Sequence, residues 1–292
     1  MIKHLLLVVV VLGLVGGDWK PDRRPIGLIW TGPGGTGWPP AEIASKGTHQ
    51  IKDRPWKRYM WHMPASWDEK AGHMSGAQWF TLTRDQRSEF RKLNKLANDL
   101  DRKFYVYGGI AMGSPFELNF TVYGGQVKAN DFYLPADHYA MWELVIAPWR
   151  KDSCDGWIFD AGAHGPYQRS ALGWCKFLRE EHSMWAAIEA FPLVGCPACV
   201  IDEKIAAAVP CVARYDFNPE GPKLVAPAGS EMHIWTVAVP DGNNPDGSTR
   251  WKTTMTVDEG VSWLKRGFIL DPDEPHDGVV MAAYQKAGIP IP

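Results

Sequence analysis

The 292-residue chain has no excess of basic residues, no internal repeat and no low-complexity tract. Its 31 lysine and arginine residues are balanced by 33 aspartate and glutamate residues, so the formal net charge is −2. Nucleic acids and anionic membrane surfaces attract basic proteins, and this balance disfavours both as partners. The composition, with 45% hydrophobic and 22% charged residues, excludes a disordered or collagen-like chain.

Cysteine is sparse and odd in number, with five residues in the chain. At least one thiol is therefore free or paired between chains. Cys196 and Cys199 form a Cys-Pro-Ala-Cys motif, whose spacing suits a redox pair, half of a zinc site or two structural thiols. A zinc site needs a second ligand pair, and only Cys211 is near in the sequence. We expect a structural role, with no metal and no cofactor.

No apolar run is long enough to span a membrane. The longest, Leu5–Val15, follows a short basic start and precedes Gly16 and Gly17. As a helix these eleven residues would rise only about 16 Å, against a hydrocarbon core of about 30 Å. The pattern predicts a signal peptide over residues 1–17 and a secreted or periplasmic protein, with no other membrane contact. An uncleaved anchor and a buried first strand are the alternatives.

Short apolar runs alternate with segments of helical periodicity through the rest of the chain. The predicted strands are residues 26–31, 58–63, 103–108, 156–160, 184–189, 211–216, 232–239 and 268–270. Strands that alternate with helices favour a parallel sheet with crossovers. Eight such strands predict the α/β class and a single (β/α)8 TIM barrel over residues 18–292. A doubly wound open sheet is the alternative.

The clearest predicted helices are residues 83–100, 167–181 and 200–209, a helix that begins at a capping box formed by Thr256 and Glu259, and a final helix after Pro275. No clear helix is visible between residues 31 and 58. The segment 32–76, rich in proline, glycine and tryptophan, predicts long loops at the carboxyl-terminal face of the barrel. Residues 241–248 predict a turn-rich loop, and residues 117–123 predict an inserted hairpin strand.

In a TIM barrel the active site lies where the strands end. The predicted strand ends carry Trp30, His62, Tyr107, Asp160, Glu189, Arg214, Asp216, Trp235 and Asp271. Three consecutive strands end in the acids Asp160, Glu189 and Asp216. Neighbouring strands lie about 4.8 Å apart, which suits the carboxylate separation of about 5–5.5 Å in retaining glycosidases. Acids at these positions also cap the following helices, which is the structural alternative.

These patterns predict Asp160 and Glu189 as a catalytic pair, supported by residues nearby in the predicted loops. The supporting set is Asp216, His164, Arg214 and His62. The chain has 15 tryptophans, and flat indole faces suit both sugar rings and protein cores. The predicted substrate-binding set is Trp30, Tyr107 and Trp235.

Two segments support this hypothesis by resemblance. The sequences Gly-Trp-Ile-Phe-Asp-Ala-Gly over residues 156–162 and Ala-Ile-Glu-Ala-Phe-Pro over residues 187–192 resemble strands 4 and 5 of TIM-barrel glycoside hydrolases. The resemblance to the α-amylase-like group implies that Asp160 is the nucleophile and Glu189 the acid/base. Ile158 stands where that group has arginine, and no aspartate ends the seventh predicted strand. The resemblance therefore points to the superfamily and to no particular family.

A second resemblance concerns the carboxyl-terminal part. Residues 234–237, 256–259, 264–267 and 269–272 are similar to the last units of glycerophosphodiester phosphodiesterases, which implies a phosphodiesterase-like barrel. The first strand lacks the His-Arg-Gly of that family, and residues 32–37 lack the lysine of a P-loop. We therefore expect a secreted glycoside hydrolase that acts on a poly- or oligosaccharide. A non-catalytic carbohydrate-binding or surface protein on the same scaffold is the alternative.

Overall fold

The computed structural model describes residues 20–29, 39–62, 66–68, 73–75, 83–108, 120–122, 125–127, 146–147, 150, 154–159, 167–190, 203–215, 225–247 and 249–291. The predicted signal segment, residues 1–17, lies outside these ranges. Within them, no helix combines the length and the apolar character that crossing a membrane requires.

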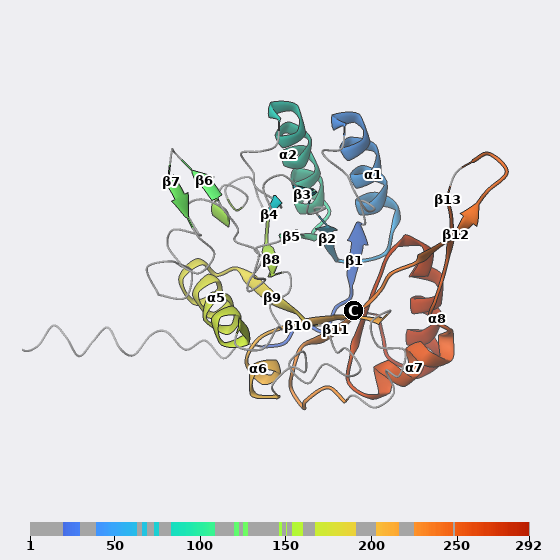
Figure 1. The fold of residues 1–292 in the computed structure, drawn as a ribbon. Coiled ribbons are helices and arrows are strands. Elements are labelled where there is room, and N and C mark those ends of the chain that lie inside the picture. The colour runs from blue at the N-terminus through green and yellow to red at the C-terminus, as the bar shows by residue number, and fades with distance from the viewer. Residues whose placement is uncertain are drawn as a thin grey trace, which may run out of the picture.

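Eight parallel strands form one sheet, as Figure 1 shows. In spatial order they are β1 (Ile26–Ile29), β2 (Arg58–His62), β5 (Lys103–Gly108), β8 (Gly156–Phe159), β9 (Trp185–Ala190), β10 (Cys211–Arg214), β11 (Met232–Thr236) and β14 (Ile269–Pro272). Spatial order equals chain order, and every neighbouring pair is parallel. All eight predicted strands are thus confirmed. They form because each apolar run is buried on both faces, between the helices outside and the barrel interior.

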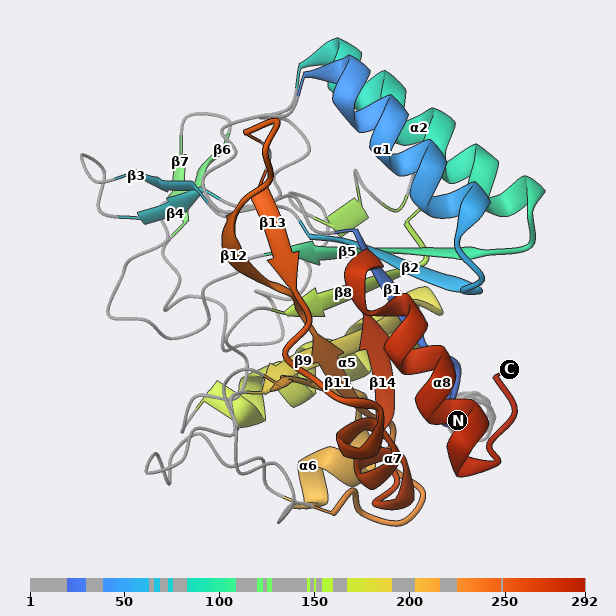
Figure 2. The same ribbon diagram turned by 90° about the vertical axis from the view of Figure 1, so that its right-hand side faces the viewer.

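The sheet closes between β1 and β14, largely through side chains. One parallel bridge joins Leu28 to Asp273, and the backbone N–H of Ile26 donates to Asp271 Oδ1 at 2.8 Å. The buried Arg54 guanidinium donates to the carbonyl oxygens of Leu28 (2.9 Å) and Pro272 (2.8 Å), one from each strand. Figure 2 shows β1 and β14 side by side. The fold is therefore a (β/α)8 TIM barrel, and the open doubly wound sheet is excluded.

Helices follow most strands and pack outside the barrel (Figure 1). They are α1 (Pro40–Asp53), α2 (Arg84–Asp99), α5 (Tyr167–His182), α6 (Glu203–Ala208), α7 (Val257–Lys265) and α8 (Asp277–Ala287), with the short 3₁₀ helix η8 (Glu274–His276) before α8. Capping boxes start α2 at Thr83 and α7 at Thr256, which confirms the prediction for Thr256. The predicted helices that correspond to α2, α5, α6, α7 and α8 are confirmed.

Helix α1 was not predicted, and its composition explains why. Its buried face consists of Ile43, Gly47, Gln50 and Ile51, so only two large apolar side chains mark the helical period. Gly47 packs closely against Leu93 of α2, and a glycine gives no apolar signal in a sequence. The helix is defined by contact with its neighbour more than by its own pattern.

Three two-stranded hairpins lie in the segments that follow β2, β5 and β11. They are β3 (Ser66–Asp68) with β4 (His73–Ser75), β6 (Phe120–Val122) with β7 (Gly125–Val127), and β12 (Val239–Asn243) with β13 (Thr249–Lys252). The hairpin strand predicted over residues 117–123 is confirmed as β6. The predicted strand 232–239 is too long, because β11 ends at Thr236 and β12 starts at Val239.

Candidate active site

Side chains that point into the barrel are polar at both ends and apolar between them. The inner apolar cluster consists of Ile26, Leu28, Met60, Tyr105, Tyr107, Ile158, Ala187, Val212, Trp235 and Val237. Because the strands are parallel, residues near their carboxyl ends lie at the face where barrel enzymes bind substrates. Tyr107, Glu189 and Trp235 are such residues on β5, β9 and β11. We call these three the carboxyl-end cluster.

The carboxyl-end cluster is a bonded and packed unit. The Tyr107 hydroxyl donates a hydrogen bond to Glu189 Oε2, and both side chains are buried. The Tyr107 and Trp235 rings meet edge to face, with centroids 5.2 Å apart and an interplanar angle of 66°. Trp235 is 1% exposed. Three of the residues that the sequence proposed as site residues therefore lie together.

The indole N–H of Trp235 is a buried hydrogen-bond donor. Its indole Nε1 is buried and has no hydrogen-bond partner among the residues that the structure describes. A buried donor without an acceptor costs about 1–3 kcal/mol, so native proteins rarely keep one without a reason. Other buried side-chain atoms of the described residues, among them Trp157 Nε1 and Thr254 Oγ1, also lack a partner, so what distinguishes the Trp235 N–H is its position toward the carboxyl end of the barrel.

The other predicted site residues fall outside what the structure describes. Trp30, Asp160, His164 and Asp216 lie between the described ranges, as do Cys196 and Cys199. The backbone of His62 ends β2 and that of Arg214 ends β10, but their side chains are not described. The separation of Asp160 from Glu189 and the supporting roles of the other residues stay predictions.

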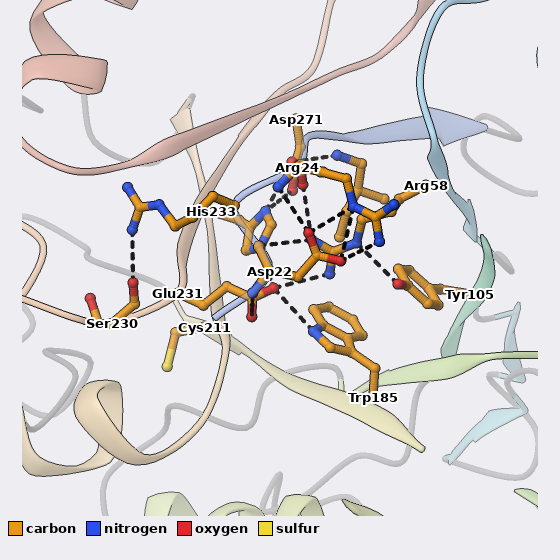
Figure 3. Close-up of polar contacts among 12 residues, drawn as sticks. Asp22, Arg24, Arg58, Tyr105, Trp185, Cys211, Ser230, Glu231, His233 and Asp271 are labelled. Carbon is orange, nitrogen blue, oxygen red and sulfur yellow. Dashed lines mark hydrogen bonds and ion pairs between the residues drawn. The ribbon is translucent and has the colours of Figure 1, made fainter. Parts of the chain in front are cut away.

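A second polar group occupies the opposite, amino-terminal end of the barrel (Figure 3). We call Arg58, Glu231, His233 and Asp271 the basal ion cluster; all four are fully buried. His233 Nδ1 lies 2.9 Å from Asp271 Oδ1, and its Nε2 lies 3.0 Å from Glu231 Oε1. Arg58 Nη2 donates to the same Glu231 oxygen at 3.0 Å. The expectation that Asp271 ends a strand at the active face is wrong, because β14 continues to Pro272 and Asp271 joins this cluster.

Residues that precede β1 cover the basal ion cluster. Arg58 Nη1 donates to the backbone carbonyls of Asp22 (3.0 Å) and Arg24 (2.9 Å). The backbone N–H of Asp22 donates to Glu231 Oε2 at 2.9 Å. The cluster is thus enclosed by the chain, although Asp271 Oδ2 lacks a hydrogen-bond partner among the described residues and contacts only the charge of His233, at 2.8 Å. This is the pattern of a stabilising core at the amino-terminal face of a TIM barrel.

Two aromatic side chains bond the basal ion cluster: Arg58 Nε donates to the Tyr105 hydroxyl and Trp185 Nε1 donates to Glu231 Oε1, both at 3.0 Å. Tyr105 and Trp185 stack with centroids 4.6 Å apart, and the Arg58 guanidinium lies 4.8 Å from the Trp185 ring. Tyr105 on β5 and Trp185 on β9 are both paired with Gly156 on β8, the strand between them. Because Gly156 has no side chain, the rings can meet across β8. A Cβ at this position would lie 2.6 Å from Tyr105 Cδ1 and 2.8 Å from the Trp185 carbonyl oxygen.

We therefore expect Gly156→Ala to lower the free energy of unfolding by about 1–3 kcal/mol, the range for overpacking a filled core. The matched control is Gly278→Ala on α8, where a Cβ meets nothing within 4 Å. There alanine should stabilise by up to about 1 kcal/mol through helix propensity. Urea unfolding of the two variants and the wild type measures both effects. Equal effects at the two glycines would contradict the packing argument.

The charge state of the basal ion cluster follows from its contacts. Both ring nitrogens of His233 face carboxylates, which only accept hydrogen bonds when ionised, so the imidazole is protonated on both nitrogens. Burial lowers the pKa of His233, but the Asp271 charge and the bonds to both carboxylates outweigh it and raise the pKa above its ordinary value. Burial raises the pKa of Glu231, but His233 and Arg58 outweigh it and leave that pKa below its ordinary value. Burial keeps the pKa of Asp271 above its ordinary value.

A pH dependence of stability follows from the raised pKa of His233. The stabilisation is complete below the unfolded pKa of about 6.5 and is lost as pH rises through the higher folded value. We expect the free energy of unfolding, measured in urea between pH 5.5 and 8, to fall above pH 6.5; this window ends below the pH of about 8.5 at which thiols ionise in an unfolded chain. His49 also has a raised pKa, caused by Glu274 and Asp53, but it is half exposed. A fall that persists in His49→Asn assigns the effect to His233; a fall that disappears there contradicts it.

Cysteine chemistry is absent from the described part of the site. Cys154, Cys175 and Cys211 are buried free thiols, and burial raises the pKa of Cys154 and of Cys211 to about 12. Thiols with such pKa values are unreactive at neutral pH. Among the described residues, no group of three or more His, Cys, Asp or Glu side chains is placed to hold a metal ion.

No protein-family model and no curated protein matches the sequence. Solved structures do match. A GH27 β-L-arabinopyranosidase from Geobacillus stearothermophilus, in complex with arabinose, aligns with a TM-score of 0.52 and 12% identity over 91% of this chain and 76% of that chain. A family GH13_31 enzyme aligns with a TM-score of 0.53 and 11% identity over 87% and 66%.

A third match is the chitinase-like agglutinin RobpsCRA from Robinia pseudoacacia, with a TM-score of 0.50 and 11% identity over 90% of this chain and 99% of that chain. At these identities the likeness concerns the fold. The chain thus has the barrel fold that glycoside hydrolases use, as the resemblance of its fourth and fifth strands implied.

Proposed function

We propose that this protein is a glycoside hydrolase that acts on a poly- or oligosaccharide with carboxylates at the ends of β8 and β9. The observation that carries the proposal is the carboxyl-end cluster, in which the buried Glu189 is bonded to Tyr107 and the Tyr107 ring packs against Trp235. A buried carboxyl group with aromatic walls at the active face of a TIM barrel suits reaction at a sugar.

The register of the sheet supports a carboxylate pair. Phe159 on β8 is paired with Ile188 on β9, and Asp160 and Glu189 are the next residues along the chain. Neighbouring strands lie about 4.8 Å apart, close to the separation of about 5–5.5 Å that a retaining mechanism uses.

Trp235 and Tyr107 supply the binding chemistry. A sugar hydroxyl or ring oxygen accepts hydrogen bonds, and the buried indole N–H of Trp235 lacks an acceptor among the described atoms. Aromatic faces also cover the apolar face of a sugar ring. We further propose that residues 1–17 direct export, so that the protein meets its carbohydrate outside the cytoplasm.

One observation favours a second function. The agglutinin that shares the fold is an example of a chitinase-like barrel named for agglutination. A non-catalytic carbohydrate-binding protein would need the aromatic groups of the carboxyl-end cluster but no carboxylate pair.

Two measurements on the wild-type protein separate these functions. Reducing-sugar release from a panel of polysaccharides, oligosaccharides and aryl glycosides tests hydrolysis, and a carbohydrate array tests binding. Release from at least one substrate supports the hydrolase. Carbohydrate binding without reducing-sugar release supports the non-catalytic binding protein instead. If neither binding nor release is observed, a carbohydrate function is contradicted.

A further inference from the structure

We propose that Tyr107 is a positioning residue that keeps Glu189 ionised, so that Glu189 serves the reaction as the anion and not as the proton donor. The chemistry of this inference rests on the proposed function. The α-amylase-like resemblance implied that Glu189 is the acid/base, and the inference makes it the nucleophile instead. It also gives Tyr107 a role other than contact with the substrate.

The contact between the two side chains sets this role. Glu189 is 1% exposed, and burial by itself disfavours a charged carboxylate. The Tyr107 O–H donates to Glu189 Oε2. A hydrogen bond donated to a carboxylate stabilises its charged form, and such charge-assisted bonds are about twice as strong as neutral ones. Tyr107 therefore opposes the effect of burial.

The architecture holds Tyr107 in place for this task. Its strand, β5, is separated from β9 by β8, so the hydrogen bond reaches across the inner face of the strand that precedes Asp160. The Tyr107 ring packs against the Trp235 ring from the far side of the barrel. The bond thus draws the Glu189 carboxylate toward β8, where the second acid of the proposed pair follows.

The neighbours of Glu189 on the adjacent strands are described in part. On the adjacent strands, the described inward residues Ile158 and Val212 are apolar. The ionisable residues that follow on those strands are Asp160 after β8 and Arg214 at the end of β10, whose side chains lie outside the description.

A balanced reaction follows from an ionised Glu189. A Glu189 oxygen bonds to the anomeric carbon while the glycosidic C–O bond breaks, and the leaving oxygen takes a proton from Asp160. Water then bonds to the anomeric carbon, the bond to Glu189 breaks, and the water proton passes to Asp160. Two displacements retain the anomeric configuration, and the two acids end in their starting states.

Carbon-13 NMR of protein labelled at the glutamate carboxyl carbon tests the proposal without any substrate. Glu189→Gln identifies the Glu189 signal. We expect the wild-type Glu189 to be ionised at pH 7 and Tyr107→Phe to raise its pKa by at least about one unit, the effect of one charge-assisted bond. A wild-type Glu189 that is protonated at pH 7, or a pKa that is unchanged or lower in Tyr107→Phe, overturns the proposal. The control Tyr105→Phe changes the tyrosine that bonds Arg58 and should leave the Glu189 pKa unchanged.

Kinetics give a second readout. With a hydrolysed substrate, Tyr107→Phe should lower kcat by about 10–100-fold and move the acidic limb of the pH profile to higher pH, with KM nearly unchanged. A change in KM alone would assign Tyr107 to substrate binding and overturn the positioning role. If no carbohydrate is hydrolysed, the proposed function fails, and the NMR titration still decides whether Tyr107 holds Glu189 ionised.

Discussion

Glu189→Gln is expected to reduce kcat by about 10²–10⁴-fold, the range that a single proton-transfer or nucleophilic group contributes, while the protein stays folded. Glutamine keeps the shape of the side chain and can still accept the hydrogen bond from Tyr107. It removes the charge and the nucleophilic oxygen. Because a buried carboxylate is a local source of instability, the melting temperature should equal or exceed that of the wild type.

The proposed partner makes this prediction sharper. Asp160→Asn should reduce kcat to a similar degree, and the double variant should be little worse than either single one, because residues that act as a unit give non-additive losses. Glu180→Gln on the exposed face of α5 is the control and should retain full turnover. Initial rates on the best substrate and calorimetric melting measure the two properties. Turnover within tenfold of wild type in Glu189→Gln would remove Glu189 from the mechanism.

The largest effect on stability is expected at the basal ion cluster. Arg58→Met should lower the free energy of unfolding by about 3–5 kcal/mol, the loss found when one partner of a buried ion pair is removed. The substitution removes one of the two cations that contact Glu231, the other being His233, and it removes the donor to two backbone carbonyls. Methionine keeps most of the side-chain volume, so the loss reports charge and hydrogen bonds more than a cavity.

Arg24→Met is the matched control for this change. Arg24 forms an ion pair with Asp22, but its side chain is 36% exposed, and such pairs contribute about 0–1 kcal/mol. Urea unfolding at constant pH compares the two variants. Similar losses at both arginines would mean that the enclosed position of Arg58 is not what makes it important.

The architecture of this protein could be predicted from its sequence because the signals are local. Each strand is a short run of apolar residues, and α2 and α7 carry capping boxes within four residues. Helix α1 lacks such signals, because half of its buried face is Gly47 and Gln50. The end of β14 was placed too early, and the bonds of Asp271 to His233 and to the Ile26 backbone inside the barrel were therefore not predicted.

The basal ion cluster could not be predicted for a different reason. Arg58 and Glu231 are 173 residues apart, and no local pattern relates them. The only trace in the sequence is His233, a titratable residue inside an otherwise uncharged buried strand. By contrast, Tyr107, Glu189 and Trp235 were found together because strand ends meet at one face of a barrel. The hydrogen bond between Tyr107 and Glu189 could not be predicted, because it depends on the directions of the two side chains and not only on their positions at strand ends.

The closure of the barrel by side chains has a consequence for the newborn chain. Ile26 bonds a residue 245 positions later, and Arg54 bonds Asp277, 223 positions later. At about 5–20 residues per second on the ribosome, the first strand waits roughly 10–50 s for its last neighbour. Throughout that interval β1 presents an unpaired edge, the kind of surface that other strands can add to. Closure of the barrel is therefore the last step that the order of synthesis allows.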